Sequence, residues 1–277
     1  RANYAYWKAR GEELTIVDER PILDAPEGAE LLVGENVFSQ LDDYEMVVRT
    51  AGLDPKKIKT SGKIWSATNE FFAHCPAPII GVTGTKGKGT TASLITSILR
   101  SAGKTVHLVG NIGVSALEVL PTISPDDLVV FELSSFQLWD IERSPHIAVV
   151  LLIEPDHLNV HADLTDYVEA KTRIGLYQSA DDICIYHPTN ALSEQIAGRS
   201  TAGTKTRYGV ANDGGVYEKA GDFYQLEHKI CSTSALQLIG RHNIENACAA
   251  ITVAKACDVN DEAIEAGLRS FTGLDHR

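Results

Sequence analysis

The 277-residue sequence predicts an α/β fold with two domains, of which the second contains a mostly parallel sheet. Continuous apolar runs, which fit strands buried on both faces of such a sheet, alternate with segments of helical periodicity. A glycine-rich turn joins one of these runs to a helix, as in a P-loop-type domain. The stiff segment Pro76-Ala77-Pro78 divides the chain, so we expect one domain at residues 1–75 and the other at residues 76–277.

The first domain has the pattern of an incomplete Rossmann-like unit. Residues 4–10 fit the end of a helix that Gly11 closes. Three short strands and then a helix are predicted at residues 14–18, 31–34, 46–49 and about 64–73. A dinucleotide-type fold begins with a strand and a glycine turn, and we expect this domain to lack that first part.

The second domain has four apolar runs that predict buried strands at residues 78–82, 106–109, 128–133 and 147–153. The helix after the glycine turn, at residues 90–102, carries leucine and isoleucine on one stripe, and Gly103 ends it. Further helices are predicted at residues 163–176, 243–257 and 261–270. We expect the glycine-rich residues 198–221 to form hairpins and loops.

The composition excludes several classes of function. A formal net charge of −12 leaves no general basic surface for nucleic acid. The five cysteines are scattered without a Cys-x-x-Cys pair, which indicates reduced, buried thiols rather than disulfides or a zinc site. We find no signal peptide and no apolar run long enough to cross a bilayer. These features predict a cytoplasmic protein without membrane insertion.

The glycine-rich turn is the most informative segment of the sequence. Its glycines allow a tight bend in which consecutive backbone N–H groups point at one phosphate. The start of the following helix adds a positive dipole, and Lys88 adds a full positive charge. The turn therefore predicts a site for nucleotide phosphates formed by Gly84, Thr85, Lys86, Gly87, Lys88, Gly89 and Thr90.

Polar residues also follow other predicted strands, and ligands of open parallel sheets bind at the carboxyl ends of the strands. Glu132 lies in an apolar run, where a carboxylate is costly unless it is paired or binds a metal. It could pair with a buried lysine or arginine, but beside a phosphate loop we favour coordination of Mg²⁺ or water. His157 follows Asp156 at another strand end and could equally be an ordinary loop histidine.

Two further features have two interpretations each. Lys171 falls on the inward stripe of its helix, and spacing alone favours a side chain that extends to the helix edge over a partly buried amine with a lowered pKa. Asn243 and Asn246 lie three residues apart, where one could cap a helix or both could bind the edge of an adenine base. We expect His74 and His161 to be surface or capping residues.

Together, these segments resemble the Mur ligase family, the ATP-dependent amide ligases of peptidoglycan synthesis. Residues 83–90 are similar to the ATP loop of that family. The more specific signal is the sequence Glu-Leu-Ser-Ser-Phe-Gln-Leu at residues 132–138, which is close to the hallmark of the member that adds D-glutamate. Matching segments follow in the family's order at residues 110–113, 156–157, 170–171, 240–246 and 273–277.

The resemblance implies roles in nucleotide and metal binding. Lys88 would hold the ATP phosphates, Asn243 and Asn246 would contact adenine, and Arg277 would contact the ribose or the phosphates. Lys171 would be carbamylated and would bind a metal through its new carboxylate. The residues around two Mg²⁺ ions would be Thr90, Glu132, His157 and Lys171, and the catalytic residues would be Lys88, Lys171 and His157.

The resemblance also implies the substrates and the reaction. Asn111, Ser134 and Asp156 would line the muramoyl-peptide end of UDP-N-acetylmuramoyl-L-alanine. Arg20 would lie near the anionic part of the uridine nucleotide. The alanyl carboxylate would attack the γ-phosphate of ATP, which gives an acyl phosphate and ADP, and the amine of D-glutamate would then attack the acyl phosphate, which forms the amide and releases phosphate. We expect a monomer.

Three features depart from the family's pattern. Gly89 stands where a hydroxyl is usual, and Gly-Lys-Gly is similar to the loop of folylpolyglutamate synthase, a relative. The first glycine turn of the uridine domain is missing, and we expect the family's C-terminal domain to be absent, so that the chain alone binds nucleotides without turnover. The alternatives are a folylpolyglutamate synthase-like ligase and a non-catalytic nucleotide-binding module.

Overall fold

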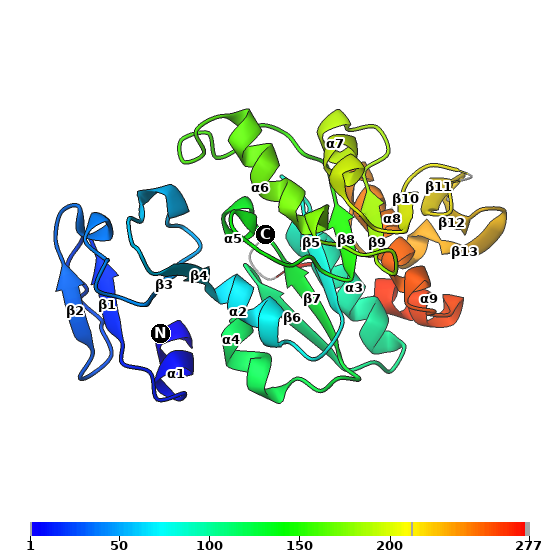
Figure 1. Ribbon diagram of the computed structural model, residues 1–277. Helices are drawn as coiled ribbons and strands as arrows, with labels where there is room; N and C mark the ends of the chain where they lie inside the picture. The colour runs from blue at the N-terminus through cyan, green and yellow to red at the C-terminus, as the bar shows by residue number, and fades with distance from the viewer. Residues whose placement is uncertain (1, 212, 275–277) are drawn as a thin grey trace.

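The computed structural model describes residues 2–211 and 213–274, and its centre is a six-stranded sheet in which all neighbouring strands are parallel (Figure 1). The strand order is β10-β9-β8-β5-β7-β6. The strands are β5 (Ile79–Thr83), β6 (Val106–Gly110), β7 (Leu128–Glu132), β8 (Ile147–Val150), β9 (Ile183–Tyr186) and β10 (Thr204–Arg207). The four strands expected from the apolar runs are confirmed, whereas β9 and β10 were not predicted.

Burial on both faces explains why the central strands are continuously apolar. Every residue of β5 and β8 is buried. Because successive side chains of a strand point to opposite faces, the strands contribute to two cores. Ile80 and Val149 belong to one core, and Ile79 and Val150 belong to the other.

Helices close both cores. One core takes side chains from α3 (Lys88–Ser101), α8 (Arg241–Ala256) and α9 (Asp261–Ser270). The other takes side chains from α2 (Ala67–His74), α6 (Leu164–Leu176) and α7 (Ala191–Arg199). The shorter helices α4 (Ala116–Val119) and α5 (Ser135–Leu138) follow β6 and β7. The predicted counterparts of α3, α6, α8 and α9 are confirmed to within two residues.

The glycine-rich stretch after α7 differs from its prediction. It contains the parallel strand β10 before the hairpins begin. The hairpins form an antiparallel meander of β11 (Val216–Lys219), β12 (Asp222–Gln225) and β13 (His228–Ser232). The sequence of β10, Thr-Lys-Thr-Arg, is polar because this strand lies at the edge of the sheet and is partly exposed.

The front part of the chain contains two separate pairs of parallel strands. After α1 (Ala2–Lys8), β1 (Thr15–Asp18) pairs with β2 (Glu30–Val33), and β3 (Met46–Arg49) pairs with β4 (Lys63–Ser66). The short 3-10 helices among the described residues are η1 (Val37–Ser39), η2 (Pro55–Lys57), η3 (Leu120–Thr122) and η4 (Thr233–Ala235).

The start of the helix predicted at residues 64–73 was wrong. Residues 64–66 belong to β4, and the side chain of Ser66 accepts a hydrogen bond from the backbone N of Asn69 and so caps α2. The buried ring of Phe71 in α2 contacts Phe131 in β7, with 5.4 Å between the ring centroids. Although α2 precedes Pro76, it therefore packs against the central sheet.

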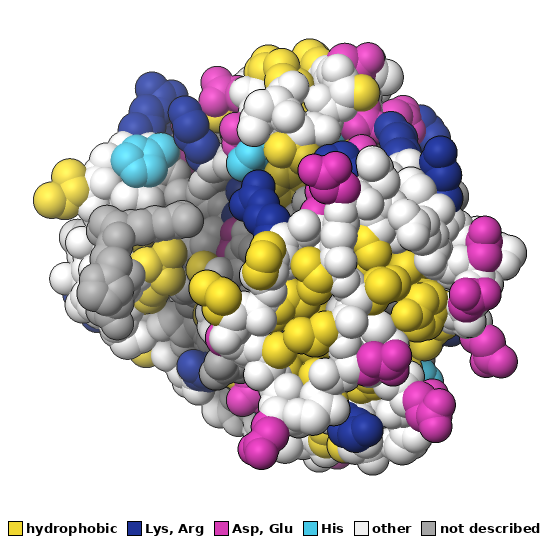
Figure 2. Space-filling view, turned by 90° about the vertical axis from the view of Figure 1, so that its left-hand side faces the viewer, with side chains coloured by type: hydrophobic (Ala, Val, Ile, Leu, Met, Phe, Trp, Pro, Cys, Tyr) yellow, Lys and Arg dark blue, Asp and Glu magenta, His cyan; other side chains and the backbone are white. Residues whose placement is uncertain are grey.

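Two expectations about the whole chain can be compared with the structure. The five cysteines are free, as predicted from their spacing. Cys184, Cys231 and Cys248 are buried as expected, whereas the expected burial was wrong for Cys75 and Cys257, which are partly exposed. Of the described helices, none is long and apolar enough to span a membrane. On the face seen in Figure 2, the acidic and basic side chains drawn in colour are scattered among one another, without a continuous basic patch.

Candidate active site

The glycine-rich turn joins β5 to α3 at the carboxyl edge of the sheet. Helix α3 begins at Lys88, and its N-cap is Gly87, whose φ of 81° is a left-handed conformation that strains other residues. A Cβ atom at Gly87 would also lie 2.4 Å from Oδ1 of Asn246. Backbone conformation and packing therefore both require glycine at the start of α3.

Thr85 holds the turn in place. Its Oγ1 donates a hydrogen bond to the carbonyl O of Glu154 at 2.9 Å and lies 2.9 Å from Oη of Tyr167. Nζ of Lys88 donates to the carbonyl O of Thr85 at 3.1 Å. The side chain of Lys86 is exposed, with Nζ 3.6 Å from Oε2 of Glu154. The protein itself thus fixes the shape of the turn and holds the Lys88 side chain against it.

Lys171 is buried against the same turn, with only 1% of its surface exposed. Its Nζ donates hydrogen bonds to Oγ1 of Thr83 at 3.1 Å and to the carbonyl O of Gly84 at 3.0 Å. The Thr83 hydroxyl in turn donates to the carbonyl O of Leu133 at 2.9 Å. The prediction that Lys171 extends to the helix edge was wrong, because helical spacing does not reveal that β5 and the turn after it supply two oxygen acceptors.

The charges around Lys171 define the centre of the site. Burial holds the pKa of the Lys171 amine well below its usual value, and the positive charge of Lys88 lowers it further. The carboxylates of Asp156 and Glu132 oppose this shift. Four ionisable side chains from the turn, β7, the loop after β8, and α6 therefore act on one another at this edge of the sheet.

Glu132 lies at this edge, between the ends of β5 and β6. It is the last residue of β7, is buried, and pairs in register with Val82 of β5 and with Gly110 of β6. Gly110 has a φ of 117°, and a Cβ atom there would lie 2.2 Å from the carbonyl O of Glu132. Gly110 lets the chain pass close to Glu132, and the exposed Asn111 follows directly after it.

The Asp156-His157 pair contacts the hallmark segment. His157 has a left-handed φ of 53°, its backbone N donates to Oδ1 of Asp156 at 2.9 Å, and its Nε2 lies 3.4 Å from Oδ2 of Asp156. The His157 ring lies 4.9 Å from the ring of Phe136. Ser134, two residues before Phe136, is the N-cap of α5. The structure therefore brings these sequence-predicted residues together.

The two asparagines lie within α8, whose N-cap is Gly240, so the capping interpretation was wrong. Nδ2 of Asn243 donates to the carbonyl O of Ile239 at 2.8 Å, and Nδ2 of Asn246 donates to Oδ1 of Asn243 at 3.3 Å. Oδ1 of Asn246 accepts from Oγ1 of Thr91 at 3.3 Å. Asn246 thus connects α8 to the first turn of α3, beside the glycine-rich turn.

One predicted residue lies apart from this group, and another cannot be placed relative to it. Arg20 is exposed in the front part of the chain, where its backbone N donates to Oδ1 of Asp18 at 2.9 Å. Arg277 lies outside the described residues.

His161 was expected to be a surface or capping residue, and both interpretations were wrong, since it is buried and the N-cap of the nearby helix α6 is Asp163. Its side chain is buried, with Nε2 2.9 Å from Oγ of Ser135 and Nδ1 3.0 Å from Oδ2 of Asp166. Its ring stacks on Phe136, with 5.4 Å between the centroids. The signal in the sequence that could have predicted this burial is the pair of aromatic residues Phe136 and Trp139, because large aromatic rings pack against other side chains, here against the His161 ring. His74 lies exposed in the last turn of α2, as expected.

The donors at the site fit a magnesium ion better than a zinc ion. The described residues contain no group of three or more His, Cys, Asp or Glu side chains that could hold a metal. The donors present are the buried Glu132 carboxylate, the hydroxyl of Thr90 in the first turn of α3, and His157. Mg²⁺ keeps several waters and takes phosphate oxygens, so it needs few protein ligands, whereas structural zinc takes four.

Comparison with known proteins gives the class to which this site belongs. Residues 82–254 match the Mur ligase middle domain, and the chain therefore belongs to the Mur ligase family. The match includes the glycine-rich turn, Glu132, Lys171 and Asn246.

Several curated relatives are similar to nearly all of the chain, and each of them is a UDP-N-acetylmuramoylalanine–D-glutamate ligase. One from Clostridium kluyveri is 35% identical over 90% of the chain, and one from Streptococcus thermophilus is 35% identical over 91%. One from Streptococcus equi subsp. zooepidemicus is 33% identical over 96%. The chain spans 56%, 58% and 62% of the lengths of these relatives.

Solved structures share the fold. A Neisseria meningitides UDP-N-acetylmuramate:L-alanyl-gamma-D-glutamyl-meso-diaminopimelate ligase superposes with a TM-score of 0.62 at 20% identity, covering 98% of this chain and 94% of that one. Escherichia coli FolC in complex with ADP superposes with a TM-score of 0.53 at 19% identity, covering 74% of this chain and 60% of that one.

Proposed function

We propose that this protein is an ATP-dependent, ADP-forming amide ligase that adds D-glutamate to UDP-N-acetylmuramoyl-L-alanine through an acyl phosphate. The observation that carries the proposal is Lys171, a fully buried amine with a lowered pKa that contacts a phosphate loop. A buried lysine is costly, and its position at the carboxyl edge of a parallel sheet is where ligands bind. The names and identities of the curated relatives support the choice of substrates.

The phosphate loop accounts for nucleotide binding. The backbone N–H groups after Gly84 and the start of α3 offer positive dipole to the phosphates of ATP, and the Lys88 ammonium neutralises part of their charge. This charge matters because the alanyl carboxylate and the triphosphate repel each other before they react. Asn243 and Asn246 would contact the adenine, close to the loop that Asn246 already touches.

The neutral Lys171 amine is the form that reacts with carbon dioxide. The nitrogen forms a bond to the carbon, one carbon–oxygen π bond becomes a lone pair on oxygen, and one proton leaves to solvent. The product is a carbamate anion. Lys88, whose charge disfavours an ammonium at this position, would favour this anion. Carbamylation would therefore turn a repulsive pair of side chains into an attractive one.

Glu132, Thr90, His157 and the carbamylated Lys171 would hold Mg²⁺. When bound, the ion supplies positive charge that stabilises the phosphoryl oxygens. Burial of Glu132 in the sheet keeps its carboxylate in one orientation.

Asn111, Ser134 and Asp156 would line the muramoyl-peptide end of the substrate. They follow β6, β7 and β8, three strands whose carboxyl ends share one edge. Arg20 would bind the anionic part of the uridine nucleotide in the front domain at residues 1–75. Such an enzyme would act in the cytoplasm as a monomer, in cell-wall biogenesis.

Phosphate release tests this function. The full-length protein is supplied with ATP and Mg²⁺ and with one of two substrate pairs, UDP-N-acetylmuramoyl-L-alanine with D-glutamate, or a folate with L-glutamate. We expect release with the first pair only. Release with the folate pair would favour a folylpolyglutamate synthase-like ligase, and release with neither would leave a non-catalytic nucleotide-binding module.

Carbamylation of Lys171 can be tested separately with ¹³C-labelled bicarbonate and carbon NMR. We expect one protein-bound carbamate resonance. The matched variant Lys171→Arg, which keeps a long cationic side chain but cannot form the carbamate, should lack it. A resonance that persists in the variant would contradict the assignment.

A further inference from the structure

The helix that carries the hallmark residues is too short to be stable alone. Helix α5 has four residues, and Ser134 at its N-cap forms a capping box with Gln137. The backbone N of Gln137 donates to Oγ of Ser134 at 3.2 Å, and the backbone N of Ser134 donates to Oε1 of Gln137 at 2.9 Å. Helix nucleation is unfavourable, so one turn keeps its position only through tertiary contacts. We call residues 134–140 the acceptor segment.

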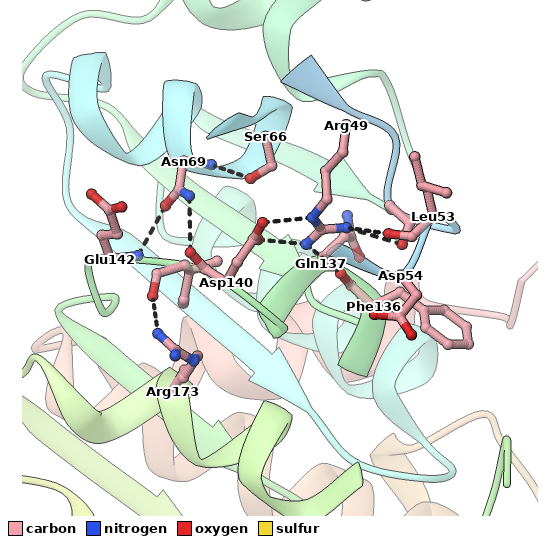
Figure 3. A network of polar contacts seen from close by, with 12 residues as sticks. Arg49, Leu53, Asp54, Ser66, Asn69, Phe136, Gln137, Asp140, Glu142 and Arg173 are labelled. Carbon is pink, nitrogen blue, oxygen red and sulfur yellow. Dashed lines mark hydrogen bonds and ion pairs between the residues drawn. The ribbon is translucent and has the colours of Figure 1, made fainter. Parts of the chain in front are cut away.

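Arg49, from the front part of the chain, supplies the strongest of these contacts (Figure 3). It is the last residue of β3 and its side chain is fully buried. Its Nε donates to Oδ2 of Asp140 at 2.6 Å, its Nη2 donates to Oδ1 of Asp140, and Nη2 also donates to the carbonyl O of Phe136 at 2.9 Å. One guanidinium therefore holds both a carboxylate and a helix carbonyl of the acceptor segment, in the forked geometry typical of arginine.

The same guanidinium orders the loop that follows β3. Nη1 of Arg49 donates to the carbonyl oxygens of Thr50 and Ala51, each at 3.2 Å, and to that of Leu53 at 3.4 Å. This loop follows the carboxyl end of a parallel strand, and so does the acceptor segment after β7. Ligands of parallel sheets bind at such ends. A single side chain thus joins a candidate ligand loop of the front part to one of the central part.

Two other side chains add hydrogen bonds to the segment. Asn69 of α2 donates through Nδ2 to the carbonyl O of Asp140 at 3.0 Å and accepts from the backbone N of Glu142 at 2.9 Å. His161 contacts Ser135 near the other end of the segment. The acceptor segment is therefore held at both ends, and Arg49 is its link to β3.

We propose that Arg49 is a positioning residue. Through Asp140 and the carbonyl of Phe136, it holds the acceptor segment, including Ser134, at a fixed position relative to the loop at residues 50–53. The substrate would then meet the two loops at a fixed separation. The identity of that substrate rests on the ligase function proposed above, whereas the ordering of the segment does not.

Amide hydrogen exchange tests the ordering directly. The variants are Arg49→Lys, which keeps the charge but loses the fork, Asp140→Asn, and the two combined. The probes are the backbone amides of Gln137 and Leu138, which bond to Ser134. We expect each single variant to speed their exchange about tenfold, as for the loss of a charged hydrogen bond. The double variant should be no faster than the faster single variant, because both remove one interaction.

The matched control is Arg207→Lys. Arg207 also binds one aspartate through two nitrogens, with Nε 2.8 Å and Nη2 3.2 Å from the Asp213 carboxylate, but it lies in the edge strand β10. This variant should leave both amides unchanged. If Arg49→Lys does not fold, as judged by circular dichroism, the Asp140→Asn variant alone decides the outcome.

Kinetics of the full-length protein provide the second measurement. We expect Arg49→Lys and Asp140→Asn to raise KM for UDP-N-acetylmuramoyl-L-alanine about tenfold and to leave KM for ATP within about twofold. A merely structural residue would raise both. Unchanged exchange at Gln137 and Leu138, or an equal rise in both KM values, overturns the positioning role. If the wild-type protein lacks ligase activity but exchange responds as expected, the ligase proposal fails and the ordering by Arg49 stands.

Discussion

Replacing Gly87 by alanine separates the two reasons for glycine at the start of α3. Alanine at a φ of 81° costs about 1–2 kcal/mol, because the left-handed conformation brings Cβ close to the carbonyl oxygen. Its Cβ would also lie 2.4 Å from Oδ1 of Asn246. To avoid this contact, Asn246 must give up its bonds to Thr91 and Asn243, each worth about 0.5–1.5 kcal/mol. The total destabilisation expected is about 2–5 kcal/mol.

Gly103→Ala is the matched control, because Gly103 has a φ of 76° and a Cβ atom added there would have no neighbouring atom within 4 Å. It should cost only the conformational term of about 1–2 kcal/mol. Urea denaturation measures both variants, and titration with a fluorescent ADP analogue measures nucleotide affinity. We expect Gly87→Ala to weaken nucleotide binding and Gly103→Ala to leave it unchanged. Equal loss of stability in the two variants, or unchanged affinity in Gly87→Ala, would refute this account of the loop.

Three further predictions concern buried groups. The pKa of Lys171 is lower in the folded chain than its value of 10.5 in an unfolded chain, so the unfolded chain binds more protons. The stability of the wild type relative to Lys171→Met should therefore rise with pH up to about 10.5. Urea denaturation of both proteins in carbon-dioxide-free buffer at about pH 7 and about pH 10 tests this, and a stability difference that does not change with pH would contradict it. Phe71→Ala should lower the free energy of unfolding, measured by urea denaturation, by about 3–5 kcal/mol, because it leaves a cavity at a fully buried position. Leu23→Ala, at a position that is 97% exposed, should change it by less than about 0.5 kcal/mol. Similar values for the two variants would contradict the packing described. Burial raises the thiol pKa to about 12 for Cys248 and to about 11 for Cys184 and Cys231. Iodoacetamide near neutral pH should therefore label these three thiols only after unfolding, and labelling of any of them in the folded chain would contradict their burial.

The central sheet was predictable because burial on both faces leaves a direct trace in the sequence. The runs that became β5 and β8 contain no polar residue that would break the pattern before the strand ends. The edge strand β10 leaves no such trace, since its polar residues face solvent. Strand β4 was read as helix because its four residues continue into α2 without a glycine or proline between them.

The candidate site was predictable where chemistry depends on local sequence and not where it depends on contacts distant in the chain. The glycine-rich turn before α3 and the buried Glu132 could be found from neighbouring residues alone. The surroundings of Lys171 could not, because its acceptors Thr83 and Gly84 lie far from it in the sequence. Arg49 gave no signal, because its partner Asp140 is far away in the sequence and neither residue stands in a recognisable motif.

The hydroxyl of Thr83 determines how a neutral Lys171 amine is oriented. Its only hydrogen is committed to the carbonyl of Leu133, so towards Lys171 it can act only as an acceptor. The carbonyl of Gly84 is likewise only an acceptor. A neutral amine has two hydrogens, and these two oxygens engage both of them. The nitrogen lone pair is then directed at neither protein oxygen and stays available to an incoming electrophile. Thr83→Val would remove one of the two acceptors, so the Lys171 amine would no longer be held in this orientation.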